Sequence, residues 1–118
     1  MSHTMNISLE LKDQDALRAA CERRNFGLME YGEHKLYSSK EIGIGVKLPG
    51  WSYPLVVKDN GTVAYDTYGG RWGKESWITE LKAYYGVEKA KIEARRAGHS
   101  VYETVDQQTQ DLVLRISV

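Results

Sequence analysis

The sequence predicts an α+β fold, a two-layer sandwich in which two amphipathic helices cover one face of a mostly antiparallel sheet. Several short stretches alternate apolar and polar residues, as half-buried strands do. Short turn sequences join them, and Asp59-Asn60-Gly61 is a strong hairpin signal that favours antiparallel neighbours. Two longer stretches instead place apolar residues at helical spacing.

The first unit is predicted to be a strand followed by a helix, over about residues 6–26. Residues 7–11 alternate in polarity and indicate the strand. Asp13 can cap the helix, because its carboxylate accepts hydrogen bonds from unpaired backbone amides. Residues 25–27 end the helix, with Gly27 expected in the left-handed conformation. The apolar face of this helix contains Leu17, Ala20 and Cys21, so we expect Cys21 to be a buried structural thiol.

The middle of the chain is predicted to be rich in strands. Two of them flank Gly32, and a longer one carries Gly43 and Gly45 in its interior, which indicates a bulge or the close approach of another segment. Pro49-Gly50 turns the chain, and a hairpin follows. The expected strands cover residues 28–31, 35–37, 42–48, 55–57 and 62–65.

A second, longer helix is predicted from Ser76, which is the expected N-cap, to Gly98, which ends it. Gly86 lies inside this helix and is interpreted as a point of close packing. Strands over 101–105 and 112–116 complete the sheet. The core-facing stripe of the helix consists of Ile78, Leu81, Tyr85 and Ile92.

Length and composition limit the class of protein. The 118 residues predict one domain over 1–118, and 42% hydrophobic with 27% charged residues excludes a disordered chain. No apolar run approaches the ~18 residues of a membrane span, and the first residues lack signal-peptide features. Cys21 is the one cysteine, which fits a reducing, cytoplasmic location. Sixteen basic and sixteen acidic residues argue against bulk nucleic-acid binding.

Several motifs, taken in order, resemble a known family. They are Met1-Ser2-His3, Val46-Lys47-Leu48-Pro49-Gly50, Trp72-Gly73, and the stretch from Tyr85 through Ala94 to Gly98. Together they resemble the family called hypothetical chloroplast reading frame thirty-five, a domain of unknown function from cyanobacteria, plastids, other bacteria and some phages. The resemblance implies a small soluble protein, often encoded near an ATPase of the AAA type. It brings no established activity and therefore no catalytic residues.

Catalytic and metal-binding patterns are missing from the sequence. His3, His34 and His99 have no ligand spacing, and no histidine is placed to activate Cys21. The acidic residues near the second helix are candidates for acid–base catalysis, but carboxylates at a helix start more often stabilise the helix dipole. These residues are Asp66, Glu75 and Glu80. We therefore expect no enzyme, no metal and no cofactor.

The best candidate site is the glycine-rich loop before the second helix. Its spacing differs from a P-loop, and Glu75 occupies the position of the hydroxyl residue. The loop still offers a helix N-terminus with two cations and an aromatic ring, which suit a nucleobase with a phosphate. The alternative is that the aromatic residues are structural and the loop is only a connector. Tyr53 is expected to lie near the loop. The predicted ligand-binding residues are Trp51, Tyr68, Gly70, Arg71, Trp72, Gly73 and Lys74.

Two functions are consistent with these features. The first is a non-catalytic module that captures an anionic, nucleotide-like ligand, which in a phage-encoded member would sequester a host signalling nucleotide. The alternative is a protein–protein adaptor or a regulatory subunit, with the neighbouring AAA-type ATPase as its candidate partner. Eight tyrosines and three tryptophans against one phenylalanine are typical of interfaces. A sheet face left open by the helices would then receive a protein partner or a second copy in a homo-oligomer.

Overall fold

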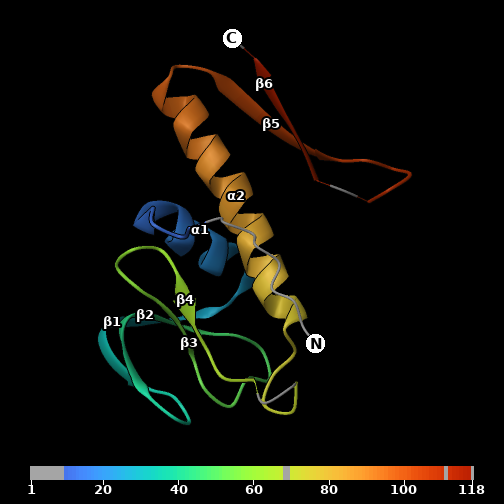
Figure 1. The fold of residues 1–118 in the computed structure, drawn as a ribbon. Coiled ribbons are helices and arrows are strands. Elements are labelled where there is room, and N and C mark those ends of the chain that lie inside the picture. The colour runs from blue at the N-terminus through green and yellow to red at the C-terminus, as the bar shows by residue number, and fades with distance from the viewer. Residues whose placement is uncertain (1–9, 68–69, 111, 118) are drawn as a thin grey trace.

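The computed structural model describes residues 10–67, 70–110 and 112–117, and it confirms the α+β class (Figure 1). The predicted strand over 7–11 lies outside these ranges except for Glu10 and Leu11, which form no strand. The elements in chain order are α1 (Gln14–Arg24), β1 (Gly27–Lys35), β2 (Lys40–Lys47), β3 (Leu55–Val57), β4 (Val63–Ala64), α2 (Ser76–Arg96), β5 (Ser100–Val105) and β6 (Leu112–Ser117).

The ends of α1 follow from side-chain capping and backbone conformation. The Asp13 carboxylate accepts hydrogen bonds from the amides of Asp15 at 3.0 Å and Ala16 at 3.1 Å, which confirms the predicted N-cap. At the other end the left-handed residue is Asn25, with φ 63°, and not Gly27, which already begins β1. The predicted residue was wrong because asparagine also tolerates the left-handed region.

Four strands form an antiparallel sheet in the order β1-β2-β3-β4. The two strands predicted around Gly32 are a single strand, β1, whose register against β2 shifts between Met29 and Gly32. Such a bulge bends a strand without ending it. The predicted hairpin is confirmed, because β3 and β4 pair across a turn in which Gly61 has φ 85° and donates to the Lys58 carbonyl at 2.9 Å.

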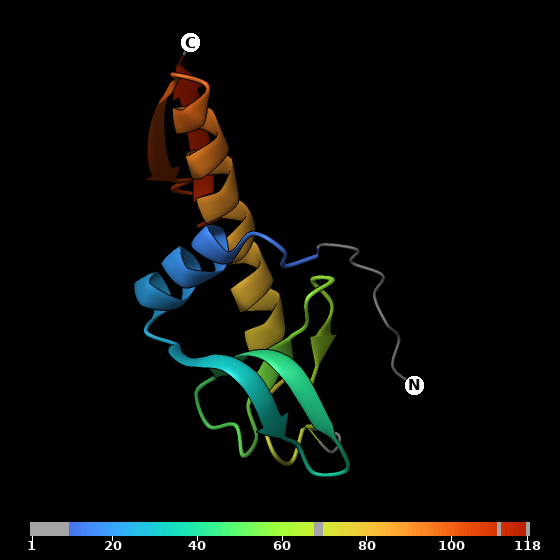
Figure 2. The ribbon, with the colours of Figure 1, turned by 90° about the vertical axis from the view of Figure 1, so that its left-hand side faces the viewer.

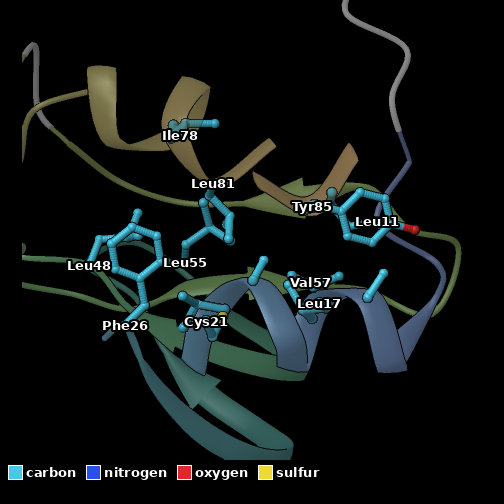
Figure 3. Packing of buried hydrophobic residues seen from close by; sticks show 13 residues of the cluster. Leu11, Leu17, Cys21, Phe26, Leu48, Leu55, Val57, Ile78, Leu81 and Tyr85 are labelled. Carbon is cyan, nitrogen blue, oxygen red and sulfur yellow. The ribbon is translucent and has the colours of Figure 1, made fainter. Parts of the chain in front are cut away.

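Both helices pack on the same face of this sheet, as predicted (Figures 2 and 3). Val46 pairs with Leu55 and Ile44 with Val57, so these side chains share one face. Cys21 is completely buried among them, which confirms the predicted burial of its thiol. Burial raises the pKa of this thiol to about 11. The buried cluster contains Leu11, Ala16, Leu17, Ala20, Cys21, Phe26, Val46, Leu48, Leu55, Val57, Ile78, Leu81 and Tyr85.

The opposite face of the sheet is covered near its centre, which corrects the expectation of an open face. Val56, which pairs with Gly45 on that face, has no exposed surface. A Cβ on Gly45 would lie 3.0 Å from the Met29 sulfur and 3.1 Å from Cε1 of His34. Nε2 of His34 in turn lies 3.1 Å from the Gly43 carbonyl oxygen. The interior glycines therefore permit the close approach that the sequence indicated.

The second helix has the predicted extent but not all of the predicted details. Glu75 occupies the N-cap position without a side-chain hydrogen bond, and Ser76 is the first helical residue, so Ser76 is no cap. A Cβ on Gly86 would meet nothing within 4 Å, so the close packing predicted there was wrong. Gly98 ends the helix as predicted, with φ 82° and its amide 3.0 Å from the Arg95 carbonyl.

The last two strands form a separate antiparallel sheet, which we call the arm, rather than extending the main sheet. The arm lies at the C-terminal end of α2, away from the four-stranded sheet (Figure 1). The Cα radius of gyration is 15.3 Å, against about 13.5 Å for a compact chain of this length. The arm therefore makes the molecule elongated.

Four charged side chains join the arm to both helices. Arg23 of α1 donates to Glu88 of α2 at 3.0 Å and to Glu103 of β5 at 2.7 Å. Lys91 lies 3.2 Å from Glu88 and 3.4 Å from Glu103. We call these four side chains the ionic cluster. Each carboxylate has two cationic partners, and two cations face two carboxylates, so the charges balance. Hydrogen bonds from Arg23 hold the pKa of Glu103 below its ordinary value.

Candidate functional site

The described part of the predicted loop is folded around one carbonyl group. The amides of Gly70 and Trp72 both donate to the carbonyl oxygen of Thr67, at 3.0 and 2.9 Å. Gly70 has φ 94°, a conformation that glycine adopts without strain. Tyr68, one of the predicted ligand-binding residues, lies outside the described residues. The two hydrogen bonds join Thr67 to the described residues from Gly70 onward.

Trp51 lies directly on the loop, as the sequence predicted. A Cβ on Gly73 would come within 2.6 Å of Cγ of Trp51, so the indole ring covers this glycine. The ring nitrogen of Trp51 donates to the Lys74 carbonyl at 3.1 Å, and the Ser52 amide donates to the Trp72 carbonyl at 2.8 Å. The Trp51 ring therefore fills the space beside Gly73, and a ligand cannot approach this glycine from that side.

Two further rings, those of Tyr37 and Tyr53, gather around Trp72 of the loop, and we call these three residues the aromatic tip. The centroid of Trp72 lies 4.7 Å from that of Tyr37 and 5.6 Å from that of Tyr53, and the two tyrosine centroids are 6.3 Å apart. Tyr37 is 63% exposed, whereas Tyr53 and Trp72 are half-buried. Asp66 fixes the backbone beneath Tyr37, because its carboxylate accepts from the Tyr37 amide at 2.9 Å.

The charges around the aromatic tip have both signs. Arg71 and Lys74 are exposed and stand on either side of Trp72 in the chain. Asp66 and Glu75 bring negative charge, and burial together with nearby Glu75 raises the pKa of Tyr65. An anion at this end of the molecule would therefore have to approach from the side of the two cations.

The first turn of α2 is not an open row of amide donors. The Trp77 amide donates to the Lys74 carbonyl at 3.2 Å, and the Ile78 amide donates to the Glu75 carbonyl at 2.9 Å. These short-range bonds satisfy donors that a helix N-terminus usually leaves unpaired. Contacts to a phosphate would therefore come from the Arg71 and Lys74 side chains.

Sequence reasoning missed two features. Tyr37 belongs to the aromatic tip, but its position after β1 gave no signal that it would reach the loop. A cavity of about 350 Å³ between α1 and the β1–β2 hairpin was also missed, because its lining looks like ordinary helix and strand surface. Within the described ranges no cluster of metal-ligating side chains occurs. No helix in the same ranges is long and apolar enough to cross a membrane.

Comparisons with family models, with curated proteins and with solved structures gave no match. The resemblance to the hypothetical chloroplast reading frame thirty-five family therefore stays a prediction. A function for this protein has to be inferred from the geometry of its own residues.

Proposed function

We propose that the protein is a non-catalytic module that binds a small anionic ligand with a flat ring, such as a nucleotide, at the aromatic tip. The observation that supports the proposal is the convergence of three aromatic rings from separate segments beside a loop with two cations. A ligand of this kind needs both features, a ring surface for its base and positive charge for its phosphate.

In the proposed complex the base stacks on the exposed face of Tyr37, and contact with Trp72 supports that ring. An aromatic contact of this kind contributes ~0.5–1.5 kcal/mol beyond the area that it buries. Arg71 or Lys74 contacts the phosphate through a charge-assisted hydrogen bond. The buried thiol of Cys21 fits a reducing compartment, so we propose that this function is cytoplasmic. In a phage-encoded member of the resembled family, the same site would sequester a signalling nucleotide.

Calorimetric titration with a panel of linear and cyclic nucleotides tests the proposal. We expect saturable binding by the wild type and at least a tenfold loss of affinity in Arg71→Ala, since a charge-assisted hydrogen bond contributes ~1.5–3 kcal/mol. Tyr37→Ala should also weaken binding, because it removes the ring on which the base stacks. Tyr102→Ala is the matched control, because Tyr102 is 60% exposed but lies on the arm. Absence of binding across the panel, or equal loss in the control, contradicts the proposal.

A second function, that of a protein adaptor, is supported by the arm. A two-stranded sheet is marginal in water by itself, and each strand leaves one edge unpaired within the described residues. Val105 and Ile116 on the arm are 45% and 49% exposed. We propose that a strand of the partner pairs with the outer edge of β6, with the neighbouring AAA-type ATPase as the partner that the resemblance implies.

Hydrogen exchange tests the adaptor function. The purified ATPase is expected to slow exchange of the β6 amides in the wild type and to have no such effect on Ile116→Lys. Slower exchange at high concentration of the chain alone would instead identify a second copy as the partner. No change in exchange in either experiment contradicts the adaptor function.

A further inference from the structure

We infer that the cavity between α1 and the β1–β2 hairpin is a second binding site, which takes a small zwitterion with an apolar side chain, such as a free apolar or aromatic α-amino acid. Its volume of about 350 Å³ lies at the small end of the ~300–1,000 Å³ that ligand pockets span. This size suits one small organic molecule. The lining residues are Gln14, Leu17 and Arg18 of α1, Leu28, Met29, Glu30 and Tyr31 of β1, and Ile44 of β2.

The floor of the cavity is apolar and firmly held. Leu17 belongs to the buried cluster, and Leu28 and Ile44 pack against that cluster while staying half-buried. An apolar side chain placed on this floor would be removed from water, and that transfer is the main favourable term for such a group.

Tyr31 forms one wall of the cavity. Its hydroxyl donates to the Asp59 carboxylate at 3.1 Å, so the ring spans from β1 to the turn between β3 and β4. A preformed wall lowers the ordering cost that a ligand would otherwise meet on binding.

The rim carries one cation and one anion from opposite sides. Arg18 follows Gln14 by four positions on α1, so both lie on the helix face that borders the cavity, and Glu30 lies on β1. Both charged side chains are exposed, and no other described residue forms an ion pair or side-chain hydrogen bond with either of them. Opposite charges above an apolar floor complement the carboxylate and ammonium groups of an amino acid.

Arg18 is suited to the carboxylate, because a guanidinium group presents a planar fork of donors. Glu30 would accept from the ammonium group. A ligand with a carboxylate alone would place its charge near Glu30 without compensation, and an amine alone would do the same near Arg18. The pair of charges therefore selects a zwitterion over either singly charged analogue.

Titration of the ¹⁵N-labelled full chain with L-phenylalanine or L-leucine, followed by NMR, tests this site. We expect saturable shifts centred on the amides of residues 28–31. L-phenylalaninamide and 3-phenylpropionate, which each lack one charge, should bind at least about tenfold more weakly. The absence of saturable shifts with both amino acids overturns the inference, and so does equal affinity for the singly charged analogues.

Two exposed substitutions assign the charges. Arg18→Gln is expected to weaken L-phenylalanine at least about tenfold but not to weaken the amide analogue, and Glu30→Gln should weaken the amino acid but not phenylpropionate. Arg95→Gln, an exposed arginine at the end of α2, is the matched control. Loss of binding in the control, or none in the two variants, overturns the assignment.

Discussion

Glycines with the same conformational freedom have opposite roles in this chain. Gly73 has no room for a side chain, because the ring of Trp51 occupies the space that a Cβ needs. Gly86 faces open space in the middle of a helix, where glycine costs stability without a packing benefit. Composition and spacing do not distinguish the two positions, since the neighbour that decides the role of Gly73 comes from a distant part of the sequence.

Alanine substitutions at these two glycines are expected to act in opposite directions. Gly73→Ala should lower the free energy of unfolding by ~1–3 kcal/mol, because Trp51 must move. Gly86→Ala should raise it by ~0.5–1 kcal/mol, since alanine restricts the unfolded chain and favours the helix. Urea denaturation of both variants measures the two changes. A loss of stability in Gly86→Ala would show that the helix needs glycine there for a reason other than space.

At the scale of elements, local signals predicted most of the structure. The carboxylate cap at Asp13, the left-handed glycines at Gly61 and Gly98, and the helical stripe of α2 depend on residues close in sequence. The errors arise where distant segments decide the outcome. The bulge in β1 depends on its partner strand β2. The strands β5 and β6 pair with each other, and Arg23 of α1 contacts Glu103 of β5.

The ionic cluster makes the attachment of the arm sensitive to acid. The folded state lowers the pKa of Glu103 below its ordinary value of 4.5, mainly through hydrogen bonds from Arg23. A lowered pKa contributes stability above the ordinary value, and this contribution is lost as the pH falls through the folded-state pKa. The wild-type free energy of unfolding should therefore decrease more steeply between about pH 5 and pH 3 than that of Glu103→Gln.

Urea denaturation at several pH values measures both slopes. Glu41→Gln is a control for general acid effects, because Glu41 has a lowered pKa owing to Lys58 and Ser39 but lies on β2, far in sequence from the arm. Parallel curves for the wild type and Glu103→Gln would mean that Glu103 contributes nothing to stability through its charge.

At the scale of the whole molecule, the sequence predicted the class and the residues near the loop better than their arrangement. Trp51 and Tyr53 reach the loop because the turn after β2 returns the chain to it, as the Ser52–Trp72 hydrogen bond shows. Tyr37 joins them through pairing of distant segments, for which a single sequence carries no signal. The cavity under α1 has the same origin, since it exists only where a helix spans a bent hairpin.

The arm also lies outside the buried cluster, whose members all come from residues 11–85 (Figure 3). A chain that ends at His99 keeps all of these residues. It also keeps the hydrogen bond at the end of α2, in which the His99 amide donates to the Ala94 carbonyl at 2.9 Å. It loses Glu103, whereas Glu88 remains to pair with Arg23 and Lys91. We therefore expect the shortened chain to unfold cooperatively, with a free energy of unfolding lower by only ~1–2 kcal/mol, and to have a smaller hydrodynamic radius. Calorimetry and sedimentation velocity measure these properties, and a shortened chain without a cooperative transition would show that the arm is needed for the body to fold.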